Sequence, residues 1–285
     1  MTQPAPAIGV NHPYNGAKMA HQFIRSMKYL IARHVCRNSF LTAVERKFGA
    51  EFKFKTEDVV GRRIYKNGEY EPEVSNYLSN NIVFMENDIS LDIGANIGWY
   101  SILLHKIMPA SGTIYCFEPD QLNYELLASN IKSNGAANVI AINKALSNKR
   151  ETKKLYRYSN KNLGRHSLLD INSDDSIDFE TLIWDEFLET KKVDFSRIKL
   201  TKIDIEGYEL FALLGAKRVL ENLRCLICEF EPEHMVKGGG VAPDELISLL
   251  EDAGFSANLI YDGRLVPADR ESIFSHAPCD IVWTK

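Results

Sequence analysis

From residue 81 onwards, short apolar runs alternate with segments whose apolar residues recur every three or four positions. The runs predict strands, and the recurring spacing predicts amphipathic helices. The expected strands are residues 89–93, 113–117, 139–143, 198–205, 225–230, 256–261 and 280–284. The expected helices are residues 97–108, 122–133, 182–189, 209–220 and 243–253, and residues 156–180 are expected to form a polar loop. This alternation predicts an α/β fold with a mostly parallel seven-stranded sheet and helices on both faces.

Residues 1–80 follow a different pattern and are expected to extend a domain formed by residues 81–285. Prolines and glycines in residues 1–16 predict a flexible lead-in. Residues 17–48 have apolar positions at helical spacing and are rich in Lys and Arg, with Glu45 as their one acid. Residues 52–70 alternate, and Asn67-Gly68 is typical of a hairpin turn, so we expect a β-hairpin there and a helix over residues 71–78. This helical and hairpin extension is expected to act as a lid or to dimerise.

The basic helical segment has two interpretations. A basic amphipathic helix can lie on an anionic membrane or dock a partner. It can also pack on the main domain and leave its basic face in solvent. Peripheral membrane contact through residues 17–48 and a homodimer are therefore both open.

Composition excludes several classes of protein. The chain has 285 residues and a formal net charge of −4, so a protein that binds nucleic acid through overall basic charge is not indicated. Its apolar runs are far shorter than the roughly 20 residues of a spanning helix, and no secretory signal pattern is evident. Five cysteines do not make a disulfide framework, and Cys225 and Cys228 should point to opposite faces of one strand. We expect a cytoplasmic protein, with peripheral membrane contact left open.

The chemistry begins at the turn after the first predicted strand, Leu91-Asp-Ile-Gly-Ala-Asn-Ile-Gly98. Ligands of open parallel sheets bind outside the carboxyl ends of the strands. Gly94 and Gly98 allow a tight turn into a helix, whose free N–H groups suit an anionic group. Glu118 follows the second predicted strand, where a carboxylate can accept both hydroxyls of a ribose.

The glycine spacing favours one nucleoside cofactor over another. G-x-x-x-G lacks the pyrophosphate fingerprint of NAD enzymes. Asp92 disfavours a diphosphate but suits an ammonium group, and a ligand with an amino acid at one end and adenosine at the other is S-adenosylmethionine. In the alternative interpretation, the glycines only shape the turn and Glu118 is a surface acid.

These residues resemble the FkbM family of class I, Rossmann-like methyltransferases that depend on S-adenosylmethionine. The resemblance covers about residues 74–230 and rests on residues 91–101, Phe117-Glu-Pro-Asp120, Asn143-Lys-Ala-Leu-Ser147 and Lys202-Ile-Asp-Ile-Glu-Gly-Tyr-Glu209. It implies O-methylation, often of sugar hydroxyls in glycans or natural products. It also implies cofactor contacts from Asp92, Gly94, Asn96, Gly98, Glu118, Pro119, Ala145, Leu146 and Ser147. The chain departs from the family on the substrate side, with Thr181-Leu-Ile-Trp-Asp185 in place of Thr-Leu-Asp.

Methyl transfer to a hydroxyl needs a group that takes the hydroxyl proton. Asp204 and Glu206 alternate at the end of the fourth predicted strand, so both carboxylates should point to one side. Each has a structural alternative, which is to cap the next helix or to pair with Lys202. His166 in the polar loop is another candidate base or an exposed histidine, and its neighbour Arg165 suits an anionic sugar such as a uronate.

A second group of polar residues follows the fifth predicted strand. Glu229 and Glu231 share a face and, with Asp204, offer oxygen ligands for Mg²⁺ or Mn²⁺. The sequence therefore leaves open whether a metal ion or a general base assists the methyl transfer. Glu231 and His234 are also expected on the substrate side.

The sequence thus predicts an O-methyltransferase that uses S-adenosylmethionine and acts on a sugar hydroxyl of a glycan or glycoconjugate. A polyketide or other small natural product is the alternative acceptor. A different class stays open, namely a non-catalytic module that binds S-adenosylmethionine or a scaffold docked on a membrane.

Overall fold

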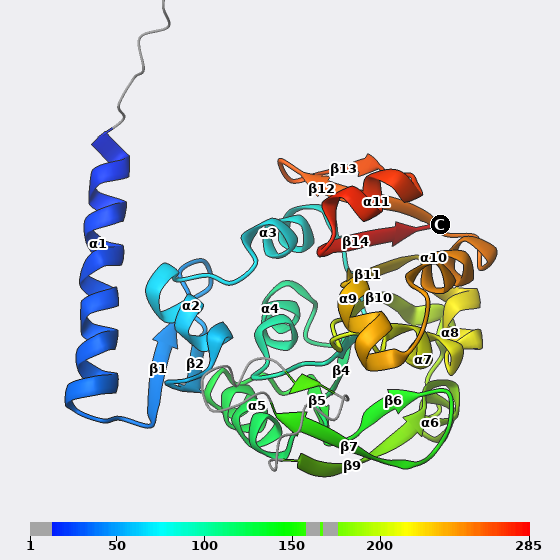
Figure 1. The fold of residues 1–285 in the computed structure, drawn as a ribbon, viewed down its shortest axis with the longest axis horizontal. Coiled ribbons are helices and arrows are strands. Elements are labelled where there is room, and N and C mark those ends of the chain that lie inside the picture. The colour runs from blue at the N-terminus through cyan, green and yellow to red at the C-terminus, as the bar shows by residue number, and fades with distance from the viewer. Residues whose placement is uncertain (1–12, 158–165, 168–175) are drawn as a thin grey trace, which may run out of the picture.

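The computed structural model describes residues 13–157, 166–167 and 176–285 (Figure 1). Its main sheet has the strand order β13-β12-β14-β11-β10-β3-β4-β5. The parallel part contains β3 (Ile89–Ile93), β4 (Thr113–Phe117), β5 (Val139–Ile142), β10 (Ile198–Ile203) and β11 (Cys225–Phe230). The antiparallel part contains β12 (Ser256–Tyr261), β13 (Arg264–Pro267) and β14 (Cys279–Thr284). The predicted mostly parallel α/β fold is confirmed.

The described main sheet has eight strands, not the predicted seven. The additional strand is β13, which pairs with β12 as a hairpin. Asp262 and Gly263 between them both have positive φ, 48° and 73°, as a tight hairpin turn requires. Four residues were too short a run for the apolar pattern to reveal.

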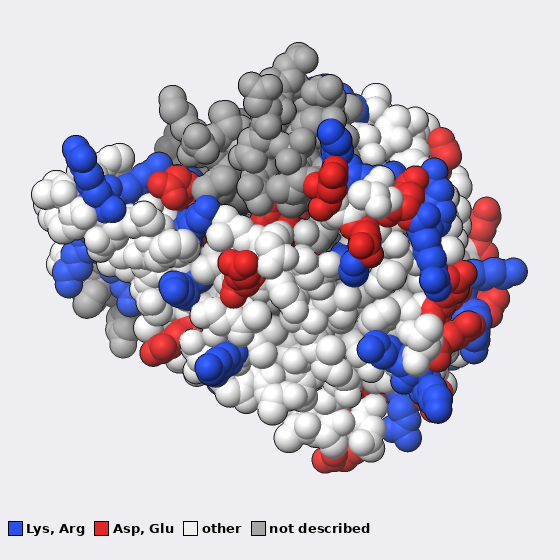
Figure 2. Space-filling view, turned by 90° about the horizontal axis from the view of Figure 1, so that it is seen from below, with Lys and Arg blue, Asp and Glu red and all other residues white. Residues whose placement is uncertain are grey.

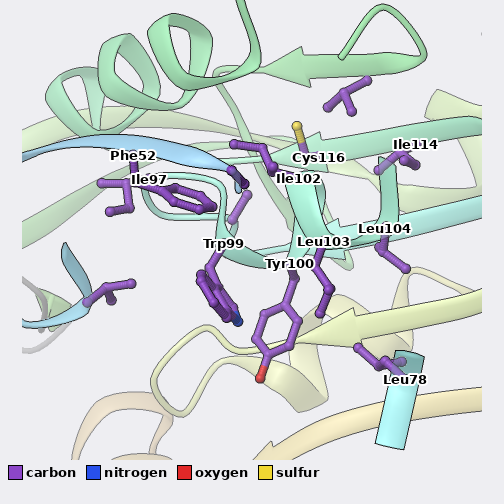
Figure 3. Close-up of a cluster of buried hydrophobic side chains, with 14 of the residues drawn as sticks. Phe52, Leu78, Ile97, Trp99, Tyr100, Ile102, Leu103, Leu104, Ile114 and Cys116 are labelled. Atoms are coloured by element: carbon purple, nitrogen blue, oxygen red, sulfur yellow. The ribbon is translucent and has the colours of Figure 1, made fainter. Parts of the chain in front are cut away.

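Helices cover both faces of the sheet, as predicted. One buried cluster contains residues of α3 (Pro72–Asn81), α4 (Trp99–Ile107) and α5 (Gln121–Ser133). The other contains residues of α6 (Trp184–Thr190), α7 (Glu209–Leu214), α8 (Lys217–Asn222), α10 (Pro243–Asp252) and α11 (Arg270–His276). Cys225 belongs to the first cluster and Cys228 to the second, so the two thiols do lie on opposite faces. Figure 3 shows Trp99 and Tyr100 at the border of the first cluster, with the Tyr100 hydroxyl directed away from Cys116.

A second, smaller sheet contains the described parts of the predicted polar loop, residues 156–157, 166–167 and 176–180. Its strands have the order β6 (Ala145–Ser147), β9 (Ser176–Ile183), β7 (Thr152–Arg157) and β8 (His166–Ser167). Because β9 runs to Ile183, the helix expected from residue 182 begins at Trp184. The helix expected over residues 209–220 is broken into α7 and α8 at Gly215, where a Cβ would lie 2.2 Å from the carbonyl oxygen of Ser147.

The N-terminal extension differs most from expectation. It contains α1 (Pro13–Leu30), a π-helical turn η1 (Ile31–Val35), β1 (Phe40–Val44), β2 (Glu51–Lys55) and α2 (Val59–Asn67). The expected helix thus ends well before residue 48, and the hairpin is β1-β2 instead of residues 52–70. Asp58 caps α2 through a hydrogen bond from the Gly61 N–H, and left-handed Gly68 ends it. Asn67-Gly68 is therefore a helix terminus and not a hairpin turn.

Asn130 is one of the side chains that join the extension to the main domain. The Asn130 amide on α5 accepts from the Lys53 N–H at 2.7 Å and donates to the Lys53 carbonyl at 3.0 Å. It also donates to the Ile97 carbonyl at 2.9 Å, within the turn between β3 and α4. Buried Asn130 therefore ties β2 to the segment that the sequence assigns to the cofactor. The division of the chain at residue 80 stays a prediction.

Among the residues that the structure describes, none of the helices has both the length and the apolar character needed to cross a bilayer.

Candidate functional site

The turn after β3 is packed tightly against the end of β10. The Asp204 N–H donates to the Ile93 carbonyl at 2.9 Å. Gly94 has φ +84°, and a Cβ built on it would lie 1.8 Å from the Asp204 carbonyl oxygen. Only glycine fits this position, because both the space and the backbone conformation exclude a side chain. The glycine thus brings the carboxyl ends of the two strands together.

Glu118 lies in the wall beside this turn. One of its carboxyl oxygens accepts from the Asn96 N–H at 2.8 Å and the other from the Asp120 N–H at 2.9 Å. Burial raises the pKa of Glu118 to about 8. The protonated carboxyl group has an O–H donor and further acceptor positions beyond these two bonds, so it retains capacity for two ribose hydroxyls.

A pocket of about 490 Å³ opens at the carboxyl ends of β3, β4 and β10. Its volume lies within the range of small-molecule sites. Nine of the predicted site residues line it, namely Gly94, Asn96, Glu118, Pro119, Ala145, Leu146, Ser147, Asp204 and Glu206. The structure therefore brings seven of the nine expected cofactor residues and the carboxylates of Asp204 and Glu206 into one cavity. The free acceptor positions of Glu118 and the turn at Gly94 fit S-adenosylmethionine.

Four other predicted site residues are not among those that line the pocket. Asp92 is buried beneath the turn, where it accepts a hydrogen bond from the Ser101 hydroxyl at 2.5 Å, and burial raises its pKa to about 6. A Cβ on Gly98 would lie 2.7 Å from Leu127, so this glycine serves helix packing. Glu231 and His234 belong to the segment around α9 (Pro232–His234), after β11.

His234 nevertheless contacts the pocket wall through Glu206. Its Nδ1 lies 2.8 Å from Oε2 of Glu206, which lines the cavity. The positive φ of Glu206, 55°, and the following Gly207 turn the chain sharply after Asp204. Glu206 is therefore held in place by the segment that follows β11, and His234 supports it from behind.

Two predicted residues cannot be placed. Arg165 lies outside the described residues, and only the backbone of His166, in β8, is described. Their expected roles stay predictions.

Sequence reasoning named Lys202 as a partner for Asp204 but did not predict that it is a buried cation beneath the pocket. The Lys202 side chain is 1% exposed, and its Nζ lies 3.7 Å from Oδ2 of Asp204 and 3.0 Å from Oδ1 of Asp280. Burial alone lowers the pKa of Lys202, but the carboxylates around it outweigh this and raise the pKa well above its usual value. The predicted alternative for Asp204, pairing with Lys202, is confirmed in addition to its place in the pocket.

Two further carboxyl groups surround this cation. Glu71 accepts a hydrogen bond from the Tyr100 hydroxyl, and burial raises its pKa. Burial, together with the negative charges of Asp204 and Glu206, raises the pKa of Glu229 well above the usual value. Glu71 and Glu229 therefore retain protons more readily than ordinary glutamates do, and both line the pocket.

The extension supplies another part of the wall that the sequence did not reveal. Arg62 and Arg63 of α2 line the pocket, together with Tyr70 and Glu71. Glu71 has a left-handed backbone conformation with φ 41°, which is uncommon for a residue other than glycine. No local signal marked these residues, because they reach the site only through the packing of the extension. Within the described ranges, no group of three or more His, Cys, Asp and Glu side chains is arranged to hold a metal ion.

A protein family and a named relative match this chain. The Methyltransferase FkbM domain family matches residues 92–257, more than half of the chain. The chain is 25% identical over 174 residues to the hexuronic acid methyltransferase AglP of Haloferax volcanii, a match that spans 61% of this chain and 66% of that protein.

Solved structures are similar at low sequence identity. The methyltransferase FkbM of Methylobacillus flagellatus KT has 15% identity and a TM-score of 0.47, covering 79% of this chain and 52% of that one. SMU.1697c, a methyltransferase-like protein of Streptococcus mutans solved with SAH, has 13% identity and a TM-score of 0.43, covering 76% and 98%. The family match over residues 92–257 begins at Asp92 and takes in every predicted cofactor residue. The chain belongs to the FkbM family of S-adenosylmethionine-dependent methyltransferases.

Proposed function

We propose that the protein transfers a methyl group from S-adenosylmethionine to a hydroxyl of an acidic sugar in a glycan or glycoconjugate. The observation that carries this proposal is a single cavity lined by both Glu118 and Asp204. Glu118 follows β4, beside the turn after β3, and Asp204 follows β10. An acceptor hydroxyl held between them can meet both a methyl donor and a base.

The residues that come directly after β3, β4 and β5 form the cofactor half of the pocket. Glu118 accepts the ribose hydroxyls with its remaining lone pairs, and Ala145, Leu146 and Ser147 border the adenine. When bound, S-adenosylmethionine supplies an electrophilic methyl group on sulfur. The described residues that face it then have to orient the acceptor and take its proton.

Asp204 is the proposed base. Its carboxylate lies in the pocket wall and is held 3.7 Å from the Lys202 ammonium, which fixes its position. Glu206 lines the same wall and is held by His234. Proton removal by a positioned carboxylate contributes about 10²- to 10⁴-fold to a rate. Glu71 and Glu229, whose raised pKa values favour the protonated form, can donate hydrogen bonds to the acceptor.

The acidic acceptor is proposed from the cations on the extension side of the cavity. Arg62 and Arg63 line it from α2, and Lys153 lines it from β7. Guanidinium groups bind carboxylates with two parallel hydrogen bonds. The name of the relative AglP, a hexuronic acid methyltransferase, supports an acceptor of this class.

Transfer of a labelled methyl group from S-adenosylmethionine to uronic acid glycosides tests the proposal. We expect Asp204→Asn to lower kcat by at least about 10²-fold while binding of S-adenosylhomocysteine, measured by calorimetry, stays unchanged. Neutral glycosides of the same sugars are the control for the acceptor. NADH is the control for the cofactor. Assays with EDTA and with added Mg²⁺ distinguish proton removal by a base from assistance by a metal ion.

Two outcomes contradict the proposal. Failure of S-adenosylhomocysteine to bind the folded protein would reject the cofactor assignment. Full activity of Asp204→Asn would remove Asp204 as the base and leave Glu206 and His166 to be tested by Glu206→Gln and His166→Gln.

A further inference from the structure

The N-terminal helix α1 and the π-helical turn η1 that continues it carry a continuous apolar surface that the other described residues leave uncovered. Its members recur at intervals of three and four residues, so they share one side of the helix. Phe23 is 66% exposed and Val35 is 74% exposed. We call this surface the apolar band, which consists of Phe23, Ile24, Met27, Leu30, Ile31 and Val35.

The opposite side of the same helix is fixed to the protein. Tyr29 is buried, and its hydroxyl donates to the Thr56 carbonyl and accepts from Arg33 at 3.2 Å. The Lys66 ammonium on α2 lies 4.9 Å from the centre of the Tyr29 ring. Gln22 also donates to Asn67 of α2 at 2.7 Å. The helix is thus anchored through one face, and the exposed fractions of the apolar band place it in solvent. Figure 1 shows α1 at the left edge of the molecule.

The charge around the apolar band has one sign. Residues 13–44 contain no Asp or Glu, and their Lys and Arg residues are Lys18, Arg25, Lys28, Arg33 and Arg37. In Figure 2, Lys and Arg predominate at the left end of the molecule, where α1 lies in Figure 1, whereas both signs mix at the right end. A second copy placed on the band would bring like charges together. An anionic lipid surface would provide the opposite charge and an apolar layer at the same depth.

The geometry points to binding of an anionic lipid surface by the apolar band, with α1 lying in the plane of the interface. Exposed Lys28, which adjoins the band, contacts lipid headgroups, and the apolar side chains enter the boundary of the acyl layer. Because α1 contacts α2, and α2 lines the catalytic pocket, the pocket is held next to that surface. This inference does not depend on the identity of the acceptor.

Vesicle flotation of the full chain tests the inference. We expect the protein to float with phosphatidylcholine vesicles that contain phosphatidylserine and to remain largely unbound with phosphatidylcholine alone. Phe23→Gln and Ile31→Gln should each lower partitioning by about tenfold, because each removes an inserted apolar side chain. Lys28→Glu and added salt should lower it as well.

The matched control is Met85→Gln. Met85 is 65% exposed, close to Phe23, but lies just before β3 in the main domain, so its substitution should leave partitioning unchanged. Circular dichroism verifies that every variant is folded. Equal partitioning of Phe23→Gln and the parent chain would overturn the inference. A dimer seen by light scattering that Phe23→Gln dissociates, without vesicle binding by the parent chain, would overturn it in favour of a second copy.

Discussion

The Nζ of Lys202 lies 3.0 Å from Oδ1 of Asp280, across the intervening strand β11. Lys202 pairs with Ile227 in the register of β10 and β11, and Asp280 pairs with Glu229 in that of β11 and β14. A cation from one side of β11 thus meets a carboxylate from the other, directly beneath the pocket. The ion pair joins the parallel part of the sheet to its antiparallel part and compensates the charge of Asp204.

Removal of this cation should destabilise the protein. We expect Lys202→Met to lower the free energy of unfolding by about 3 kcal/mol, because it leaves the partly buried carboxylates of Asp204 and Asp280 without their partner. Urea denaturation at neutral pH measures the change. Lys199→Met on the same strand is the control, since Lys199 is only half-buried, and it should change stability little. The deficit of Lys202→Met should shrink at acidic pH, where the carboxyl groups are protonated. A deficit below that of Lys199→Met would contradict this account.

Gly94 offers a second comparison, between a packed glycine and a free one. Gly94 and Gly135 both have positive φ, +84° and +61°, but a Cβ on Gly135 would meet nothing within 4 Å. Gly135→Ala should therefore cost about 1 kcal/mol for its conformation alone. Gly94→Ala should cost about 1 to 3 kcal/mol more, because the methyl group overlaps the Asp204 carbonyl. It should also weaken binding of S-adenosylhomocysteine. Thermal denaturation and calorimetry check both effects, and equal losses for the two variants would rule out the proposed contact.

The cofactor half of the site could be predicted because it depends on strand ends. Gly94, Glu118 and Ala145 each follow a parallel strand, and the carboxyl ends of parallel strands meet at one edge of the sheet. The strand and turn patterns of the sequence were therefore enough to predict the pocket wall that these residues form. Asp92 and Gly98 belong to the same motif, yet they support the turn from behind, which a motif alone does not distinguish.

The extension could not be predicted in the same way. Asn67-Gly68 suits a hairpin turn and a helix terminus equally well, and only Asp58, capping α2 nine residues earlier, separates the two. The acceptor side depends on contacts between distant parts of the chain. Lys202 and Asp280 are far apart in sequence, and Arg62 reaches the pocket through the packing of the extension on the main domain, to which Asn130 contributes.

Glu118 should make stability depend on pH. Its pKa in the folded protein is about 8, against 4.5 for an ordinary glutamate. A carboxyl group with a raised pKa contributes stability at acidic pH that is lost as pH rises from 4.5 through about 8. The free energy of unfolding, measured in urea between about pH 5 and about pH 9, should therefore fall with rising pH. Glu118→Gln should flatten this dependence, whereas exposed Glu125→Gln on α5 should not. An unchanged slope in Glu118→Gln would show that another group is responsible.

Arg62 separates acceptor binding from cofactor binding. It is half-buried in the pocket wall, on the helix that the extension places opposite the cofactor turn. If it binds the carboxylate of the acceptor, Arg62→Gln should raise KM for a uronic acid glycoside by about tenfold, the value of one charge-assisted hydrogen bond. Binding of S-adenosylhomocysteine should stay unchanged, because Glu118 and its hydrogen bonds lie on the other wall.

Lys66→Gln is the matched control for this experiment. Lys66 carries the same charge on the same helix, but its ammonium lies over the Tyr29 ring, away from the residues that line the pocket. A general effect of charge near the site would raise KM in both variants, whereas a direct contact would raise it only in Arg62→Gln. A neutral glycoside should show no difference between the two. Equal KM values for the acidic acceptor would remove α2 from the acceptor site and leave Lys153 on β7 as the cation to be tested.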